Sequence, residues 1–239
     1  MAQGLMEQFK DISNVEIIYA NFMDYTISEN GVYKFFSNIP FNITADILSK
    51  VFDLEGVQDI YFIIQYEAFL KYSGMPYFKE CLKSLLYKPF FEMELIHEFA
   101  PSDFIPKPNA RIVFARFTPR VKSDIDRKHK ESYLDFLAFL FSEKGETLKD
   151  KVKQIMSYEQ IKRTARDIGF SFNCIISEVT YQQWLAIFEI YLTYVPSEKK
   201  YLVKGAYNRL VCEQEKLIKM HRNRKRNGGA SRNGKRKIN

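Results

Sequence analysis

A run of five residues, Ser37-Asn38-Ile39-Pro40-Phe41, combines side chains that could hold the amino group of a nucleobase. The exocyclic amine of adenine is a poor nucleophile, because its lone pair is delocalised into the ring. The side-chain oxygen of Asn38 and a neighbouring backbone carbonyl can accept both amine hydrogens and favour a tetrahedral nitrogen. Pro40 removes a competing donor and fixes the backbone, and the ring of Phe41 can stack on an extruded base.

The alternative is a strand that ends in an ordinary turn, with Asn and Pro as its punctuation. The four residues Asn38–Phe41 alone agree with both interpretations. The surrounding pattern supplies the elements that would position the motif. Gly31–Phe36 predicts a strand that leads directly into it, and Thr44 begins a helix with apolar residues at helical spacing.

Strands alternate with helices along the first half of the chain, which indicates an α/β sheet with crossover helices. Further strands are predicted at Val15–Tyr19, Ile60–Ile64, Phe91–Phe99 and Arg111–Thr118, and a helix at Tyr77–Tyr87. After Pro119 only helices are predicted, at Asp124–Phe141, Ser157–Asp167, Tyr181–Tyr194 and Ser197–Met220. We therefore expect a sheet domain at 1–119, a helical domain at 120–196, and a helix with a tail at 197–239.

The net charge of +7 comes from the C-terminal residues 221–239, which contain eight Lys or Arg and no acidic residue. This segment has too few apolar residues to order itself, so we predict a disordered basic tail. Its charge density suits a polyanion, and RNA is the partner we expect. A merely solubilising tail is the alternative. A membrane surface is less favoured, because no hydrophobic anchor accompanies the charge.

The cysteines and histidines indicate neither a metal site nor a disulfide framework. Cys81, Cys174 and Cys212 are odd in number and far apart, which fits a reducing cytoplasm. The three histidines have no ligand spacing. The N-terminus lacks the pattern of a signal peptide, and the apolar runs are too short to span a bilayer. We expect a cytoplasmic monomer without a metal.

Four blocks of the chain, in order, resemble the Erm-type (erythromycin-resistance) 23S rRNA adenine N6-methyltransferases, which are related to the 16S rRNA dimethyladenosine transferases. SNIPFNITADILSKVF resembles the family's Asn-Ile-Pro-Tyr strand end and the helix after it. DIYFIIQYEAFLK resembles the next strand, and the segment Leu85–Ile112 contains a Phe-x-Pro-x-Pro loop. VTYQQWLAIFEIYL, around Trp184, resembles the helical domain. The resemblance covers roughly residues 5–195.

The resemblance implies an incomplete Rossmann-like methyltransferase sheet followed by an all-α domain, with S-adenosylmethionine as methyl donor and rRNA as partner. In the family, methylation of one 23S rRNA adenine blocks the binding of macrolides, lincosamides and streptogramin B. Asn38, Ile39, Pro40 and Phe41 would form the catalytic site, with Asn38 also near the cofactor. Asn21 would contact the cofactor's adenine, where the family has Asp, and Phe41 stands in place of the more usual Tyr.

Basic residues beside these elements are candidates for contact with RNA phosphates, with a solvated surface as the alternative. The candidates are Lys107, Arg111, Lys162, Arg163, Arg166, Arg222, Arg224, Lys225 and Arg226.

The ten glycines form no GxG pair, although the family holds its cofactor on a glycine-rich turn. The chain resembles the family only from the helix before its third strand. We therefore expect this chain to bind S-adenosylmethionine weakly and to fold poorly alone, as a truncated gene model, a late start codon or a degraded allele would. Two other interpretations stay open, a 16S rRNA dimethyladenosine transferase and a non-catalytic RNA-binding remnant.

Overall fold

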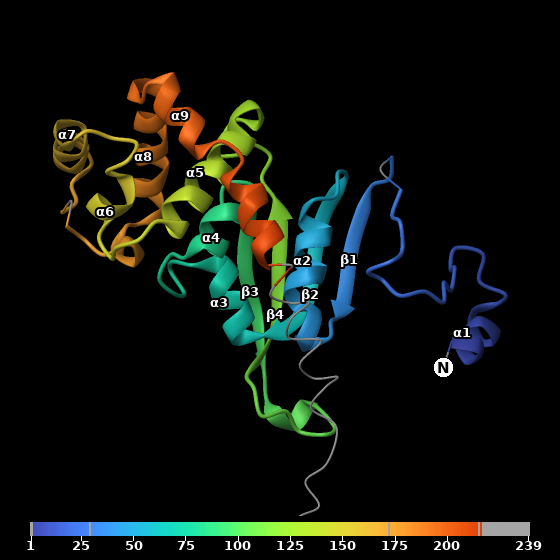
Figure 1. Ribbon diagram of the computed structural model, residues 1–239. Helices are drawn as coiled ribbons and strands as arrows, with labels where there is room; N and C mark the ends of the chain where they lie inside the picture. Colours follow the sequence, from blue (N-terminus) through green and yellow to red (C-terminus); the bar gives the residue numbers. More distant parts are fainter. Residues whose placement is uncertain (1, 29, 172, 215, 217–239) are drawn as a thin grey trace, which may run out of the picture. The chain divides into compact units, whose positions relative to one another are not determined.

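The computed structural model describes residues 2–28, 30–171, 173–214 and 216, and it divides them into two compact units (Figure 1). The first unit contains residues up to 69 together with 92–119, and the second contains 70–91 together with the residues from 120 onwards. The predicted boundary near residue 120 is one of the three crossings. Residues 70–91 were expected in the sheet domain and instead belong to the helical unit, where the Tyr133 hydroxyl donates to the Leu85 carbonyl oxygen at 3.0 Å.

The first unit is built on a mixed sheet of four strands in the order β1-β2-β4-β3 (Figure 1). The strands are β1 (Tyr33–Asn38), β2 (Val57–Gln65), β3 (Phe91–Phe99) and β4 (Ile112–Pro119). β1 runs parallel to β2, and β4 runs antiparallel to β2. Helix α1 (Ala2–Phe9) precedes the sheet, α2 (Thr44–Phe52) follows β1, and α3 (Tyr66–Ser73) follows β2.

One face of the sheet is the core of the first unit. Alternate residues of β2 and β4 point to this face, and the buried set is Ile60, Phe62, Ile64, Val113, Ala115 and Phe117. Helix α2 covers it, with the Phe52 and Phe117 ring centroids 5.4 Å apart. Phe69 packs on the same ring at 6.3 Å. Burial of this apolar surface is what holds the strands in register.

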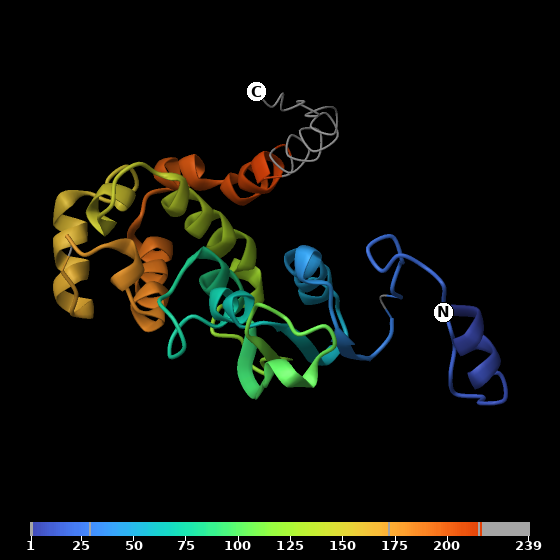
Figure 2. The ribbon, with the colours of Figure 1, turned by 90° about the horizontal axis from the view of Figure 1, so that it is seen from below.

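The second unit is helical (Figure 2). Its helices are α4 (Leu82–Tyr87), α5 (Lys130–Ser142), α6 (Leu148–Val152), α7 (Tyr158–Ile168), α8 (Tyr181–Tyr194) and α9 (Ser197–Val203). Its core includes the fully buried side chains of Tyr133, Phe136, Trp184 and Phe188. Capping boxes begin α7 at Ser157 and α8 at Thr180, which are the start signals that the sequence contains.

Several predicted elements differ in the structure. The helix expected at Asp124–Phe141 begins only at Lys130, after a 3-10 turn at Arg127–His129. Val15–Tyr19 is not a strand, and Tyr19 is 86% exposed; β-branched residues form a strand only when a neighbouring strand accepts their backbone bonds. The helix expected at Tyr77–Tyr87 is confined to Leu82–Tyr87, because the amides of Tyr77 and Phe78 close a turn on the carbonyl of Gly74.

The long helix expected at Ser197–Met220 is interrupted, and its predicted end lies outside the described residues. α9 ends at Val203, and helical residues resume at 206–214. Gly205 between them has a φ of 76°, a left-handed conformation that breaks a helix and that glycine adopts without strain. Within the described residues, no helix has the length and hydropathy needed to cross a bilayer.

Candidate functional site

Asn38 is the last residue of β1 and lies opposite Ile63 in the parallel pairing with β2. Side chains alternate along β1, so Asn38 is exposed whereas the next residue, Ile39, is 4% exposed and anchored in the core. The Ile39 amide donates to the Ile63 carbonyl oxygen at 3.4 Å. The amide group of Asn38 is therefore presented to solvent on a backbone that is fixed on both sides.

The residues after Asn38 form a closed turn. Pro40 is extended, with φ −62° and ψ 126°, and begins a single 3-10 turn at Phe41–Ile43. The Pro40 carbonyl accepts from the Ile43 amide at 3.2 Å and from the Thr44 hydroxyl at 3.3 Å. The same hydroxyl lies 3.3 Å from the Phe41 carbonyl. Phe41 itself is 37% exposed, so part of its ring is available to a ligand.

Asn21, the predicted contact to the cofactor, is used in a turn of its own. Its amide nitrogen donates to Asp24 at 2.7 Å, and its amide oxygen accepts from the Met23 backbone at 3.1 Å. Lys50 of α2 holds this turn by donating to three backbone carbonyls of residues 22–25, at 2.5 to 3.0 Å. Sequence analysis missed this anchor, because the two segments are 25 or more residues apart.

The predicted site residues fit the binding of a target adenine better than the binding of the methyl donor. Asn38 and Phe41 present an acceptor and an aromatic ring at the end of a strand, as a target adenine requires. Asn21 is exposed, and its bonds to neighbours in its own turn leave one amide hydrogen and one oxygen lone pair available. The segment before it forms no strand.

The sheet face that carries Asn38 is lined with aromatic rings. Phe36, two residues earlier on β1, is 74% exposed and lies 5.6 Å from the ring centroid of Phe114. Tyr61 stacks on Phe114 at 5.9 Å, and the Arg116 guanidinium lies 5.6 Å from the Tyr61 ring. Side chains alternate between the two faces along each strand. This alternation predicts that these residues share one face of the sheet, but it does not predict that the face is exposed.

An ion-pair cluster around the buried carboxylate of Asp59 lies at the opposite end of β1 and β2, and sequence analysis also missed it. Asp59 accepts from Arg116 Nε and from Thr118 Oγ1, both at 2.9 Å. Lys34 lies 3.8 Å from the same carboxylate. The bond from Arg116 holds the pKa of Asp59 below its ordinary value, against the effect of burial. This cluster joins three strands and is structural.

The predicted RNA-contacting residues divide into engaged and exposed side chains. Arg111 makes two bonds to Glu98, of 2.7 and 2.8 Å, and its guanidinium lies 3.8 Å from the centroid of the Tyr66 ring. Lys107 and Lys162 are exposed. The side chains of Arg163 and Arg166 are each 77% exposed, although both pair with Asp167. The tail residues Arg222, Arg224, Lys225 and Arg226 lie outside the described residues.

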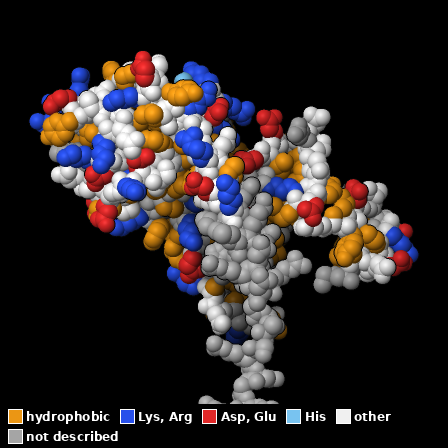
Figure 3. Space-filling view, viewed as in Figure 1, with side chains coloured by type: hydrophobic (Ala, Val, Ile, Leu, Met, Phe, Trp, Pro, Cys, Tyr) orange, Lys and Arg blue, Asp and Glu red, His pale blue; other side chains and the backbone are white. Residues whose placement is uncertain are grey.

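The charged surface gives no single-sign field on the face seen in Figure 3, where acidic and basic side chains are interspersed. No group of three His, Cys, Asp or Glu suited to a metal ion occurs in the described part of the chain. Its three cysteines are free thiols.

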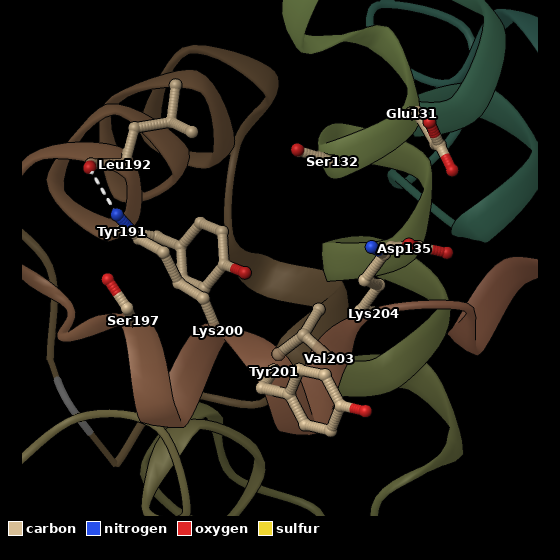
Figure 4. Close-up of a pocket in the computed structure, with 10 residues that line it drawn as sticks. All are labelled: Glu131, Ser132, Asp135, Tyr191, Leu192, Ser197, Lys200, Tyr201, Val203 and Lys204. Carbon is tan, nitrogen blue, oxygen red and sulfur yellow. Dashed lines mark hydrogen bonds between the residues drawn. The ribbon is translucent and has the colours of Figure 1, made fainter.

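A hollow of about 430 Å³ lies within the second unit, between α5, α8 and α9 (Figure 4). Its lining mixes acidic, basic and hydroxyl side chains, and includes Asp135, Tyr191 and Lys200. Asp135 is committed to the backbone amides of Gly205 and Tyr207. Desolvation, with the nearby Asp135 carboxylate, raises the pKa of Tyr191 to about 12. This hollow contains none of the predicted site residues.

The fold is that of an rRNA methyltransferase. The crystal structure of the 23S rRNA methyltransferase ErmE superposes with a TM-score of 0.72, at 19% identity, over 80% of this chain and 78% of that one. The predicted α/β sheet followed by helices is confirmed. The chain belongs to the ribosomal RNA adenine dimethylase family, whose model matches residues 1–193.

The chain is similar both to proteins named rRNA adenine N-6-methyltransferase and to proteins named ribosomal RNA small subunit methyltransferase A. An rRNA adenine N-6-methyltransferase from Bacteroides fragilis is 25% identical over 201 residues, which are 83% of this chain and 74% of the relative. The ribosomal RNA small subunit methyltransferase A of Persephonella marina is 28% identical over 165 residues, 67% of this chain and 62% of the relative. The chain is therefore assigned to the rRNA adenine methyltransferases, and use of S-adenosylmethionine follows from that family.

Proposed function

We propose that this chain methylates the exocyclic nitrogen of one adenine in 23S rRNA, in the cytoplasm and as a monomer. The consequence in a bacterium would be resistance to macrolides, lincosamides and streptogramin B. The observation that carries the proposal is the exposed amide of Asn38 at the end of β1, beside the buried Ile39 and the partly exposed Phe41. S-adenosylmethionine, when bound, supplies the methyl group.

The amine needs a second acceptor beside the Asn38 oxygen, and we assign it to the carbonyl of Ile39, the next residue along the chain. The Pro40 carbonyl accepts from the Ile43 amide within the turn, which supports this choice. Phe41 stacks on the ring of the extruded adenine. No strong general base is needed, since the donor is activated and positioning supplies much of the rate.

RNA contact completes the proposal. Lys107, Lys162, Arg163 and Arg166 are exposed cations that can lie against phosphates. Arg111 is better explained as a support of its own loop, because Glu98 holds both of its donors. The basic tail adds sequence-independent, salt-sensitive affinity.

The experiment is to express the chain in a macrolide-susceptible bacterium and to map methylated adenines in both rRNAs. We expect a raised macrolide tolerance together with a modified 23S adenine, and an Asn38→Ala variant as the matched control should give neither. A modified adenine in 16S rRNA instead would favour the small-subunit activity for which the Persephonella marina relative is named.

A non-catalytic RNA-binding remnant is the second candidate, and the absence of a GxG pair among the ten glycines favours it. We expect weak binding of S-adenosylmethionine to the chain alone, measured by isothermal titration. Binding in the micromolar range would contradict this expectation and remove the main argument for a remnant.

A further inference from the structure

The loop between β3 and β4 carries an apolar side chain that lies wholly in solvent. Ile105 is 101% exposed, more than any other large hydrophobic residue described in the first unit. Single exposed apolar residues are common on protein surfaces and by themselves indicate nothing. The way in which this loop is built and placed distinguishes Ile105 from that background.

The base of the loop is fixed by side chains on both of its strands. Arg111 joins Glu98 through two hydrogen bonds and stacks 3.8 Å from the Tyr66 ring centroid. The Phe104 ring packs edge-on against Phe99, with centroids 5.4 Å apart. At the start of the loop, the Asp103 carboxylate accepts from the Ala100 amide at 2.9 Å. Prolines at 101, 106 and 108 restrict the backbone further. The loop thus presents Ile105 from a stiff support.

The loop extends from the edge of the sheet at which Asn38 lies. β1 and β2 are parallel, so Asn38 and Gln65 end at the same edge. β4 is antiparallel and begins there, with Ile112 opposite Gln65. The Tyr66 amide also donates to the Arg111 carbonyl at 3.0 Å. In Figure 1 the loop projects past the sheet on the side of the β1 arrowhead.

We infer that Ile105 is a wedge that enters the base stack of the rRNA and fills the place that the target adenine leaves. The inference rests on the proposed function and adds a positioning residue to it. A base extruded from a helix leaves a gap with apolar walls, and proteins that unstack bases insert Ile, Leu, Phe, Met or Pro into such gaps. A β-branched side chain on a stiff loop has little rotamer freedom to lose.

The neighbouring cation agrees with this assignment. Lys107 is exposed two residues beyond Ile105 on the same loop, and a lysine beside the wedge can contact the phosphate of the displaced nucleotide. Phe41 then covers the extruded adenine, while Ile105 keeps the RNA helix from closing. Ile105 makes no bond to the reacting atoms, so it is a positioning residue.

The test uses a hairpin of the 23S rRNA target region in which 2-aminopurine, whose fluorescence rises on unstacking, replaces the target adenine. We expect the chain to raise the fluorescence, and Ile105→Ala to lower the extruded population about tenfold, from the loss of buried apolar surface. Ile105→Leu should retain the signal. Val121→Ala is the matched control, because Val121 is 109% exposed in the second unit.

A second hairpin with an abasic site opposite the 2-aminopurine separates a wedge from a general RNA contact. Extrusion there needs less help, so Ile105→Ala should come close to the unsubstituted chain. Equal fluorescence for Ile105→Ala and the unsubstituted chain on the paired hairpin would overturn the wedge while leaving the proposed function in place. No fluorescence change with the unsubstituted chain on either hairpin would overturn the wedge. No methylation of the same hairpin with adenine at the target position would overturn the proposed function as well.

Discussion

The backbone amide of Ile39 donates to the carbonyl oxygen of Ile63 at 3.4 Å, which continues the pairing of β1 with β2 one residue past Asn38. The Ile39 side chain is buried at the same point. The motif is therefore attached to the sheet by the backbone amide and the buried side chain of Ile39, whereas the side-chain amide of Asn38 is left exposed. This separation makes the role of Asn38 testable without damage to the fold.

Asn38→Ala should lower methyl transfer to rRNA about 100-fold, the typical cost of removing one group that stabilises a transition state. Unfolding should not change, because the side chain is exposed. The measurement is incorporation of labelled methyl groups at high S-adenosylmethionine concentration, together with thermal unfolding. Asn42→Ala, an exposed asparagine in the following turn, is the control. Equal activity of the two variants would exclude Asn38 from the site.

Phe41→Ala should reduce kcat/KM about tenfold to 100-fold, because stacking on a base contributes roughly 1–3 kcal/mol. Phe41→Tyr should keep most of the activity, since the ring is retained and 37% of the residue is open to solvent. The comparison is made by methylation kinetics on a hairpin RNA. A similar loss in both variants would mean that the ring packs within the protein and does not stack on a base.

Deletion of residues 221–239 should make the dependence of RNA affinity on salt concentration shallower. The segment carries eight Lys or Arg, and each phosphate contact contributes to the slope of log K against log salt. The slope is measured by RNA binding at several salt concentrations. A full-length chain with these eight residues replaced by Gln separates charge from length. If the slope does not change, the tail has no part in RNA binding.

Local sequence patterns correctly predicted the elements whose signals lie within the element itself. The apolar run at Ile60–Ile64 became the buried centre of β2, and Thr180 with Gln183 marked the start of α8. Val15–Tyr19 has the composition of a strand but pairs with no described strand, and pairing is a property of the fold that composition does not contain. Apolar spacing alone predicts one helix over Ser197–Met220, whereas Gly205 with its φ of 76° interrupts it after α9.

In the candidate site, too, local features could be predicted from the sequence and long-range contacts could not. The type and spacing of Asn38 and Phe41 were sufficient to place them at a strand end. The pairing of Arg111 with Glu98, 13 residues away across the β3–β4 loop, was not predicted. The contacts that fix side chains are long-range, so one sequence predicts which residues can do chemistry better than which of them are free to do so.

Asp135→Ala should destabilise the second unit by about 2 kcal/mol, because a buried carboxylate that caps a helix would be lost. Asp135 is 5% exposed and accepts from the amides of Gly205 and Tyr207 at 2.7 and 3.0 Å. Asp135→Asn keeps an acceptor and should cost less. Urea unfolding measures both against Glu131→Ala, an exposed residue on the same helix. Equal midpoints for the Asp135→Ala and Glu131→Ala variants would refute the capping role.

The stability of the first unit should depend on pH through Asp59, because Arg116 and Thr118 lower the pKa of its carboxyl below the ordinary value of 3.8. A lowered pKa in the folded state means that the carboxylate stabilises the fold above about pH 4, and that this contribution is lost as the pH falls through the folded pKa. Asp59→Asn should therefore be less stable than the unsubstituted chain at pH 7, by roughly 1 kcal/mol.

The difference should shrink towards pH 3, where the carboxyl of the unsubstituted chain begins to protonate. Urea unfolding at several pH values measures it, with Glu55→Gln as the control, since Glu55 is exposed just before β2. A constant difference between Asp59→Asn and the unsubstituted chain from pH 7 to pH 3 would show that the charge of Asp59 is not what joins β1, β2 and β4 at this end of the sheet.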